Sequence, residues 1–188
     1  LEVISYLERI QKKYKILKIT KKALLLDIAK LDNNETIKNL GGTIKISLEL
    51  DDPEKAIQKK IFSINSKRIH YGINSLESST KSFQELANLV KSFCKKEKIK
   101  ALHKHSKERE IPPSKSQNLD LELTLFKNKV YAVIAASDPK SYALRDEKRP
   151  YFDPLKVISV RLSKILINLA QPKKNDTLLD PFAGLGTI

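Results

Sequence analysis

The sequence predicts an α+β protein, and three observations support this fold class. Of the 188 residues, 40% are hydrophobic and 31% are charged, a balance typical of a globular chain. Apolar residues repeat at helical spacing in some segments and alternate, as in a half-buried strand, in others. The first five predicted elements follow one another in the order helix, strand, strand, helix, strand.

Residues 1–52 are predicted to form the first domain. Gly41-Gly42 ends its second helix, because glycine readily takes the left-handed conformation that follows a helix. One more strand in front would turn this order into the split βαβ, or ferredoxin-like, unit, so we expect that fold with its first strand missing. The predicted elements are a helix at 1–13, strands at 15–20 and 23–28 joined by the turn Lys21-Lys22, a helix at 34–40 and a strand at 43–50.

A boundary at Asp51-Asp52-Pro53 opens a second predicted domain at 53–137. Its most clearly patterned element is a helix at 80–98, which Thr80 can cap and whose apolar stripe includes Phe83. The other predicted elements are a short helix at 54–60, a hairpin of 61–65 and 67–73 turned at Asn65-Ser66, a strand at 99–105, and a hairpin of 119–126 and 130–136.

Residues 138–154 hold three prolines and many charges, which predicts an interdomain linker. A helix at 155–170 and a short strand at 176–179 follow, so 155–188 is predicted to begin an α/β domain. Ligands of open α/β sheets bind at the carboxyl ends of strands, and glycine lets the backbone approach a ligand closely. The predicted cofactor-binding residues after this strand are Asp180, Pro181, Phe182, Ala183, Gly184, Gly186 and Thr187.

The loop sequence Asp-Pro-Phe-x-Gly-x-Gly-Thr resembles motif I of the amino-methyltransferases, which modify exocyclic nitrogens of DNA and RNA bases. The resemblance implies that this loop binds S-adenosyl-L-methionine. Residues 142–150, Tyr-Ala-Leu-Arg-Asp-Glu-Lys-Arg-Pro, and the Asn-Leu-Ala of 168–170 are similar to the archaeal-type tRNA guanine-N2-methyltransferases that act on guanosine 10. The similarity to that family covers 138–188.

Members of that family carry a ferredoxin-like unit followed by a THUMP domain, which binds tRNA through its acceptor end. Leu40-Gly41-Gly42-Thr43 is similar to a turn of the family, and 62–73 resembles the THUMP hairpin. The resemblance implies that 1–52 and 53–137 are these two domains and that 155–188 begins a Rossmann-like methyltransferase domain. The chain departs from the family in its lysine content and its short loops, which leaves the methylated nucleotide open.

Basic residues dominate the charge of the chain. Lysine and arginine number 36 against 22 acidic residues, and the net charge of +14 predicts a polyanionic partner, either a nucleic acid or an acidic membrane surface. The family resemblance implies that this partner is tRNA. The alternative is that the protein comes from a lysine-rich proteome, in which most protein surfaces carry many lysines without a polyanionic partner. Arg145 and Arg149 either contact RNA or pin the linker. The predicted RNA-binding residues, chosen because Lys and Arg bind phosphates, are Lys91, Lys95, Lys96, Lys98, Lys100, Lys104, Lys107, Arg109, Lys115, Arg145 and Arg149.

No catalytic residue is predicted. The family's Asn/Asp-Pro-Pro-aromatic motif does not occur in this sequence, so we expect that this chain alone does not methylate RNA. The chain contains no Met and stops inside the cofactor loop. We therefore expect both of its ends to be cut points.

Other functions are less consistent with the composition. Three histidines and one cysteine, of which only His103 and His105 are close in sequence, predict no metal site. Cys94 is the single cysteine and no apolar run approaches the roughly 18 residues of a membrane span, so we expect a cytoplasmic protein that does not bind membranes. A small accessory subunit and the oligomeric state stay open. Two alternatives are a THUMP RNA-binding module that serves another tRNA modification, such as thiolation, and a DNA amino-methyltransferase.

Overall fold

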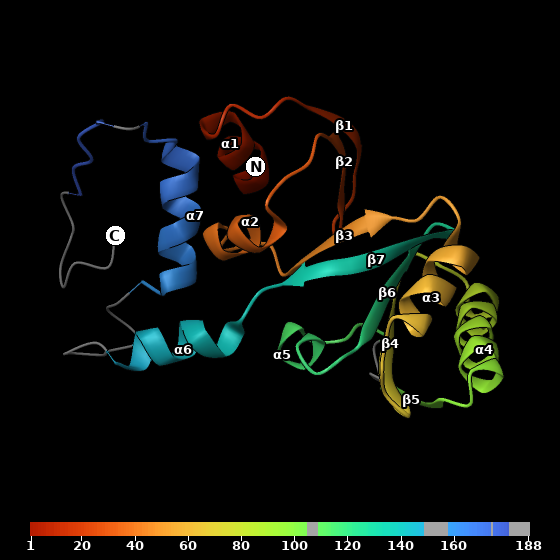
Figure 1. Ribbon diagram of the computed structural model, residues 1–188. Helices are drawn as coiled ribbons and strands as arrows, with labels where there is room; N and C mark the ends of the chain where they lie inside the picture. Colours follow the sequence, from red (N-terminus) through yellow and green to blue (C-terminus); the bar gives the residue numbers. More distant parts are fainter. Residues whose placement is uncertain (105–108, 149–157, 174, 181–188) are drawn as a thin grey trace. The chain divides into compact units, whose positions relative to one another are not determined.

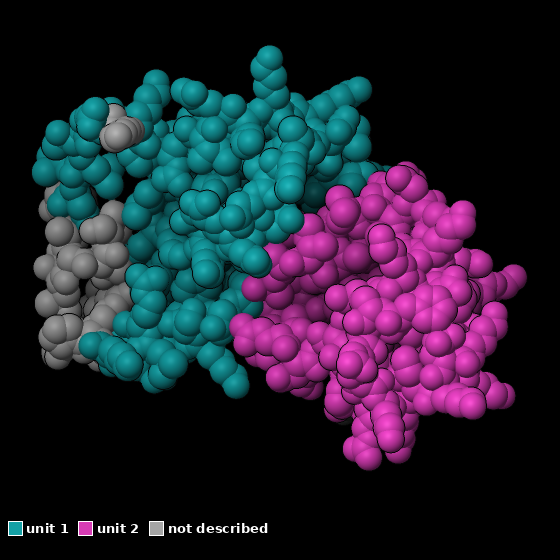
Figure 2. All heavy atoms as spheres, in the orientation of Figure 1, with its two compact units in different colours: residues 1–44, 137–188 teal, residues 45–136 magenta. Residues whose placement is uncertain are grey.

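A computed structural model describes residues 1–104, 109–148, 158–173 and 175–180 of the protein. The protein has a mixed α+β fold, with one two-stranded and one five-stranded sheet among these residues (Figure 1). It divides into two compact units. Unit 1 comprises Leu1–Ile44 and Ser137–Ile188, and unit 2 comprises Lys45–Ala136 (Figure 2).

The sheet of unit 2 has the strand order β3-β7-β6-β4-β5. β4 lies between β5 and β6 and runs parallel to both, whereas β7 is antiparallel to β6 and to β3. The strands are β3 (Lys45–Glu49), β4 (Arg68–Leu76), β5 (Lys100–Lys104), β6 (Leu121–Phe126) and β7 (Lys129–Ala136).

Two helices, α3 (Pro53–Phe62) and α4 (Thr80–Lys96), cover one face of this sheet (Figure 1). Alternate residues of β4, including Ile69 and Tyr71, point into the core beneath them and are fully buried. From α4, the apolar stripe predicted from the sequence supplies the facing side, with Val90 fully buried. The hydroxyl of Ser79 rather than that of Thr80 caps α4, accepting a 3.1 Å hydrogen bond from the backbone N–H of Ser82.

The carboxyl end of α4 closes with a Schellman motif. The backbone N–H of Ile99 donates to the carbonyl of Cys94 over 2.8 Å, and that of Lys98 donates to the carbonyl of Lys95 over 3.1 Å. Lys98 takes the left-handed φ of 55° that this motif requires. The helix therefore ends two residues before the predicted position, although no glycine marks the end.

A buried polar network lies on the opposite face of the sheet. Asn74 of β4 and Glu122 of β6 are 4% and 7% exposed. The Nδ2 of Asn74 donates to Glu122 over 2.8 Å, and the Nζ of Lys45 forms an ion pair with the same carboxylate. Beside this network, Gly72 lets Ile111 approach the sheet, because a Cβ on Gly72 would lie 2.0 Å from the Cδ1 of Ile111.

Unit 1 combines a small sheet with helices from both ends of the chain. β1 pairs with β2 in an antiparallel hairpin. The helix α1 carries buried Tyr6 and Leu7, which form a small core with Leu40. The elements are α1 (Glu2–Arg9), β1 (Tyr14–Ile19), β2 (Leu24–Ile28), α2 (Asn33–Asn39), α6 (Pro139–Glu147) and α7 (Val160–Ala170).

The end of α2 is held by side chains from α6, α7 and α1, a set of contacts that we call the α2 clamp. Four successive backbone carbonyls each accept a hydrogen bond from a distant side chain, and two successive N–H groups donate to one carboxylate. Gly41 has to be glycine here, because a Cβ would lie 2.1 Å from the carbonyl oxygen of Arg161. The pairs are Lys164 to Lys38, Asn168 to Asn39, Tyr142 to Leu40 and Arg161 to Gly41, with the N–H groups of Gly41 and Gly42 donating to Glu2.

Several predicted elements are confirmed. The hairpin β1–β2, the helix α2, the helix α4 and the hairpin β6–β7 lie within a few residues of their predicted positions. Each of them follows from a local pattern of apolar residues and turn residues, and no distant partner is needed to define it.

Other predicted elements are wrong. The hairpin predicted at 61–73 does not form: residues 61 and 62 end α3, and β4 pairs with β5 and β6. The strand predicted at 43–50 pairs with β7 in unit 2, so the described residues of unit 1 lack the last strand expected for the ferredoxin-like unit. The predicted linker contains the helix α6, which Asp138 caps.

The end of the chain also differs from the prediction. No strand forms at 176–179, because no strand lies beside it among the described residues and its backbone groups have no ladder to join. The helix predicted at 155–170 is observed from Val160, while 155–157 lie outside the described residues. Every described helix is too short or too polar to span a lipid bilayer.

Candidate nucleic-acid interface

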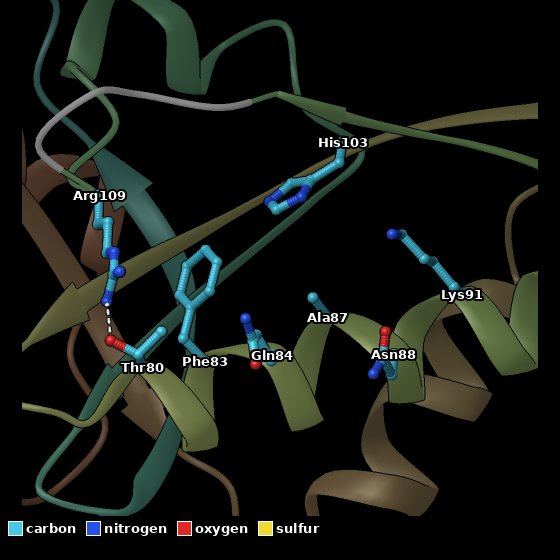
Figure 3. Close-up of a pocket in the computed structure, with 8 residues that line it drawn as sticks. All are labelled: Thr80, Phe83, Gln84, Ala87, Asn88, Lys91, His103 and Arg109. Atoms are coloured by element: carbon cyan, nitrogen blue, oxygen red, sulfur yellow. Dashed lines mark hydrogen bonds between the residues drawn. The ribbon is translucent and has the colours of Figure 1, made fainter.

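A hollow of about 280 Å³ lies in unit 2 where the parallel strands β4 and β5 end (Figure 3). Its walls come from α4, from β5 and from the segment that follows β5. The carboxyl edge of parallel strands is where ligands of such sheets usually bind, since loops and helix starts meet there. The residues that line this α4–β5 hollow are Thr80, Phe83, Gln84, Ala87, Asn88, Lys91, His103 and Arg109.

One wall is a polar stripe along α4. Thr80, Gln84, Asn88 and Lys91 follow one another at intervals of three or four residues, which places them on one face of a helix. Lys95 continues the same face one turn beyond Lys91. These side chains offer a hydroxyl, two amides and two ammonium groups. The ammonium groups and the amide nitrogens can only donate hydrogen bonds, the amide oxygens accept them, and the hydroxyl can do both.

The floor of the hollow is aromatic. The imidazole of His103 stacks on the buried ring of Tyr71, with ring centroids 4.5 Å apart and planes 7° apart. The ring of Phe83 lies 6.0 Å from that of His103 at an angle of 32°. Flat rings at the base of a cationic hollow are suited to contact with a nucleobase or a sugar.

Arg109 forms the rim on the far side from Lys91 (Figure 3). Its Nη1 donates a 3.0 Å hydrogen bond to the hydroxyl of Thr80, and its Cζ lies 5.5 Å from the ring centroid of Phe83. Its backbone φ is 55°, in the left-handed region that non-glycine residues seldom adopt. The guanidinium is therefore held over the aromatic floor by a hydrogen bond and a cation–π contact.

The charge of the hollow is positive. None of the eight described residues that line it is acidic, whereas Lys91 and Arg109 carry positive charge at neutral pH. Beneath the floor, burial raises the pKa of Tyr71 to about 12, with a smaller contribution from Cys94, and burial also raises the pKa of the Cys94 thiol. Both groups stay protonated near pH 7, so neither supplies an ionised nucleophile beneath the floor.

The structure brings together only some of the predicted RNA-binding residues. Lys91 and Arg109 line the α4–β5 hollow, and Lys95 lies one helical turn beyond Lys91 on the same face of α4. Lys96 lies on another side of α4, with its Nζ 5.6 Å from the ring centroid of Phe93. Lys98 is exposed in the turn after the helix.

The remaining predicted residues lie elsewhere. Strand alternation directs Lys100 and Lys104 of β5 to the face opposite His103. Lys115 is exposed on α5 (Pro113–Ser116), and Arg145 is exposed on α6 in unit 1. Lys107 and Arg149 lie outside the described residues.

Sequence reasoning missed most of the neutral residues of the hollow. The sequence pattern places Phe83 in the buried stripe of α4 and gives His103 no role beyond its position on a basic strand. A signal was present in Thr80, Gln84 and Asn88, which recur at helical spacing in line with Lys91. A hydrogen-bonding stripe that ends in lysines is more specific than a count of charges.

The predicted cofactor loop lies almost wholly outside the described residues. Only Asp180 is described, and it follows an irregular segment rather than the predicted strand. The geometry on which that prediction depended, a loop at the carboxyl end of a strand, is not formed by the described residues. The part of the chain that the structure describes also holds no cluster of three or more His, Cys, Asp or Glu side chains suited to a metal ion.

Comparisons with known proteins add little. The chain matches no protein-family model, and no curated protein matches its sequence. Among solved structures, the crystal structure of PH1313 from Pyrococcus horikoshii Ot3 is similar to 70% of this chain with a TM-score of 0.41 and 12% sequence identity. The match covers 44% of that protein, so this chain corresponds to less than half of its length.

Proposed function

We propose that this chain binds tRNA through a THUMP-like unit 2 and belongs to an S-adenosyl-L-methionine-dependent tRNA (guanine-N2)-methyltransferase. One observation carries the binding part of the proposal: Lys91, His103 and Arg109 share the α4–β5 hollow, and no described acidic side chain lines it. The methyltransferase part rests on the sequence resemblance of 138–188.

The hollow is suited to an RNA backbone rather than to a particular base sequence. Lys91, Lys95 and Arg109 stand where they can neutralise neighbouring phosphates, an interaction that gives affinity with little sequence selection. Phe83 and His103 add flat surfaces against which an unstacked base or a ribose can pack. Binding in this mode weakens as salt concentration rises, because each phosphate contact releases bound counterions.

Methyl transfer would need a cofactor and a base pocket. In the proposed enzyme, S-adenosyl-L-methionine supplies the methyl group to the exocyclic amine of a guanine, and Asp180 to Thr187 would hold the cofactor. None of the residues of the α4–β5 hollow takes part in that reaction. Because this sequence lacks the family's Asn/Asp-Pro-Pro-aromatic motif, we expect no methyl transfer to bulk tRNA by this chain alone, and activity in such an assay would contradict this expectation.

The binding proposal is tested by measuring tRNA affinity at several salt concentrations. Lys91→Ala and Arg109→Ala are each expected to lower affinity and to reduce the slope of log affinity against log salt by about 1, because each removes one phosphate contact. Lys59→Ala is the matched control, since Lys59 is also an exposed lysine, lies on α3 and does not line the hollow.

Two results would contradict the proposal. Equal salt slopes for the wild-type protein and both hollow variants would show that the hollow does not bind phosphates. A preference for duplex DNA over tRNA in competition would favour the DNA amino-methyltransferase alternative instead.

A further inference from the structure

We propose that Asn74, Lys45 and Glu122 form a positioning network that fixes Arg109 in the α4–β5 hollow. The inference rests on the proposed RNA-binding function, because Arg109 is one of the two cations that line the hollow. None of the three residues lines the hollow itself. They act through the backbone of 109–111, on which the direction of the arginine side chain depends.

Arg109 needs such support because of its backbone conformation. A φ of 55° places its Cβ close to neighbouring backbone atoms, and residues other than glycine avoid that region unless their surroundings impose it. The hydrogen bond from Arg109 to Thr80 also requires that the arginine leave the backbone in one direction. A freely moving segment would not keep both features.

Three hydrogen bonds pin the segment that carries Arg109. The carbonyl of Arg109 accepts from the backbone N–H of Ser75 over 2.8 Å. Two residues later, the N–H of Ile111 donates to the Oδ1 of Asn74 over 2.7 Å, and the carbonyl of Ile111 accepts from the Nζ of Lys45 over 2.5 Å. The backbone N–H and the backbone carbonyl of Ile111 are thus both hydrogen-bonded to side chains of the network.

Asn74 can serve Ile111 only when its side-chain amide is correctly oriented, and Glu122 orients it. The Nδ2 of Asn74 donates to Glu122 over 2.8 Å and to the carbonyl of Leu123 over 3.2 Å, which leaves its Oδ1 to face Ile111. Lys45 supports the same orientation, because its Nζ donates to that Oδ1 over 3.1 Å.

The burial of the ion pair is the second reason for this assignment. The side chains of Lys45 and Glu122 are 12% and 5% exposed. Removing two charges from water is costly, and apolar side chains would often support a sheet face at least as well. Lys45 is also too buried and too fully paired to contact RNA, so its charge is explained by the network and not by binding.

A double-mutant cycle in tRNA affinity tests the inference. Asn74→Ala is expected to weaken binding roughly threefold to tenfold, the loss expected for one phosphate contact. In the Arg109→Ala background, the same change is expected to cause no further loss, because the residue through which Asn74 acts is gone. Ile57→Val is the control for a general loss of stability, since Ile57 is a buried residue of α3 that packs in the core on the other face of the sheet.

A second variant covers the case in which Asn74→Ala does not fold. Lys45→Met combined with Glu122→Gln removes the contact to the carbonyl of Ile111, keeps side-chain volume and leaves no unpaired charge. It is expected to show the same dependence on Arg109. An equal loss of affinity in both backgrounds, or no loss in either, would overturn the inference.

An RNA-free measurement separates this inference from the proposed function. In the protein without RNA, NMR signals of the Arg109 side chain and the Phe83 ring are expected to shift in Asn74→Ala, and the Ile111 amide to exchange faster. Unchanged NMR signals would overturn the positioning role, whatever the tRNA affinities of the variants are. Shifted signals with unaltered tRNA affinity in Arg109→Ala would support positioning and contradict the proposed function.

Discussion

The carboxylate of Glu2 accepts a 3.0 Å hydrogen bond from the side-chain amide of Asn168, which lies 166 positions further along the chain. The same carboxylate accepts the backbone N–H groups of Gly41 and Gly42, and the amide of Asn168 also donates to the carbonyl of Asn39. Two side chains thus join α1, α2 and α7. Asn168 is only 2% exposed, so its hydrogen bonds are made where water cannot replace them.

Glu2→Ala and Asn168→Ala are each expected to lower the free energy of unfolding of unit 1 by about 2 kcal/mol, because each leaves buried donors or acceptors without partners. The double variant is expected to lose less than the sum, since both changes break the same contact. Urea unfolding measures these differences. Lys12→Ala, which changes an exposed residue after the same helix, serves as the control, and strictly additive losses would show that the two side chains do not cooperate.

Lys98 and Lys96 provide an opposite pair of changes at the end of α4. Lys98→Gly is expected to raise stability by about 1 kcal/mol, because glycine adopts the φ of 55° without strain. Lys96→Gly, inside the last helical turn, is expected to lower stability by about 1 kcal/mol. Each change removes one positive charge, so the comparison separates backbone conformation from charge. Melting temperatures that move in the same direction would contradict the Schellman assignment.

Two buried tyrosines differ in whether their hydroxyl has a partner. The hydroxyl of Tyr71 has none among the described residues, whereas that of Tyr142 donates to the carbonyl of Leu40 over 3.4 Å. Tyr71→Phe is therefore expected to leave stability at pH 7 unchanged or to raise it by about 1 kcal/mol. Tyr142→Phe is expected to lower it by about 1 kcal/mol, since the carbonyl of Leu40 loses its partner. A larger loss in Tyr71→Phe than in Tyr142→Phe would indicate an overlooked partner.

Tyr71 also predicts a loss of stability at alkaline pH. Its pKa is raised to about 12 by burial in the folded protein, while an exposed tyrosine in the unfolded chain loses its proton near pH 10. The contribution of Tyr71 is therefore fully present below pH 10 and falls as the pH rises from 10 towards 12, by up to about 2 kcal/mol. Urea unfolding across this range is expected to show a shallower decline for Tyr71→Phe. The same decline in Tyr71→Phe as in the wild-type protein would show that Tyr71 ionises as easily in the folded protein as in the unfolded chain.

Much of the fold could be predicted from local patterns alone. The helix α4 follows from an apolar stripe at helical spacing, and the hairpin β6–β7 follows from two alternating runs around a short polar turn. The hairpin predicted at 61–73 failed because a short apolar run fits a helix as well as a strand. Which of the two forms there depends on whether a strand or a helix lies beside it, and here β5 and β6 take the edges of β4.

The candidate site could be predicted only in part. The basic stretch that contains Lys91 and Arg109 was evident from charge, but charge does not tell which lysines share a surface. Strand alternation places Lys100 and Lys104 on the face of the sheet opposite the hollow. Only the contacts with Thr80 and Phe83 show that Arg109 belongs to the hollow. Asn74 gave no signal at all, because its role depends on partners from β3, β6 and 109–111.

The sequence by itself determined the α+β class, the principal helices and hairpins, and the strong positive charge, because each follows from composition or from neighbours a few residues away. Only the tertiary structure decided that β3 joins the sheet of unit 2, that Glu2 meets Asn168, and that Arg109 stands over Phe83. Those relationships join segments far apart in the chain, and they form because buried polar groups and strand edges must find partners wherever the fold brings them.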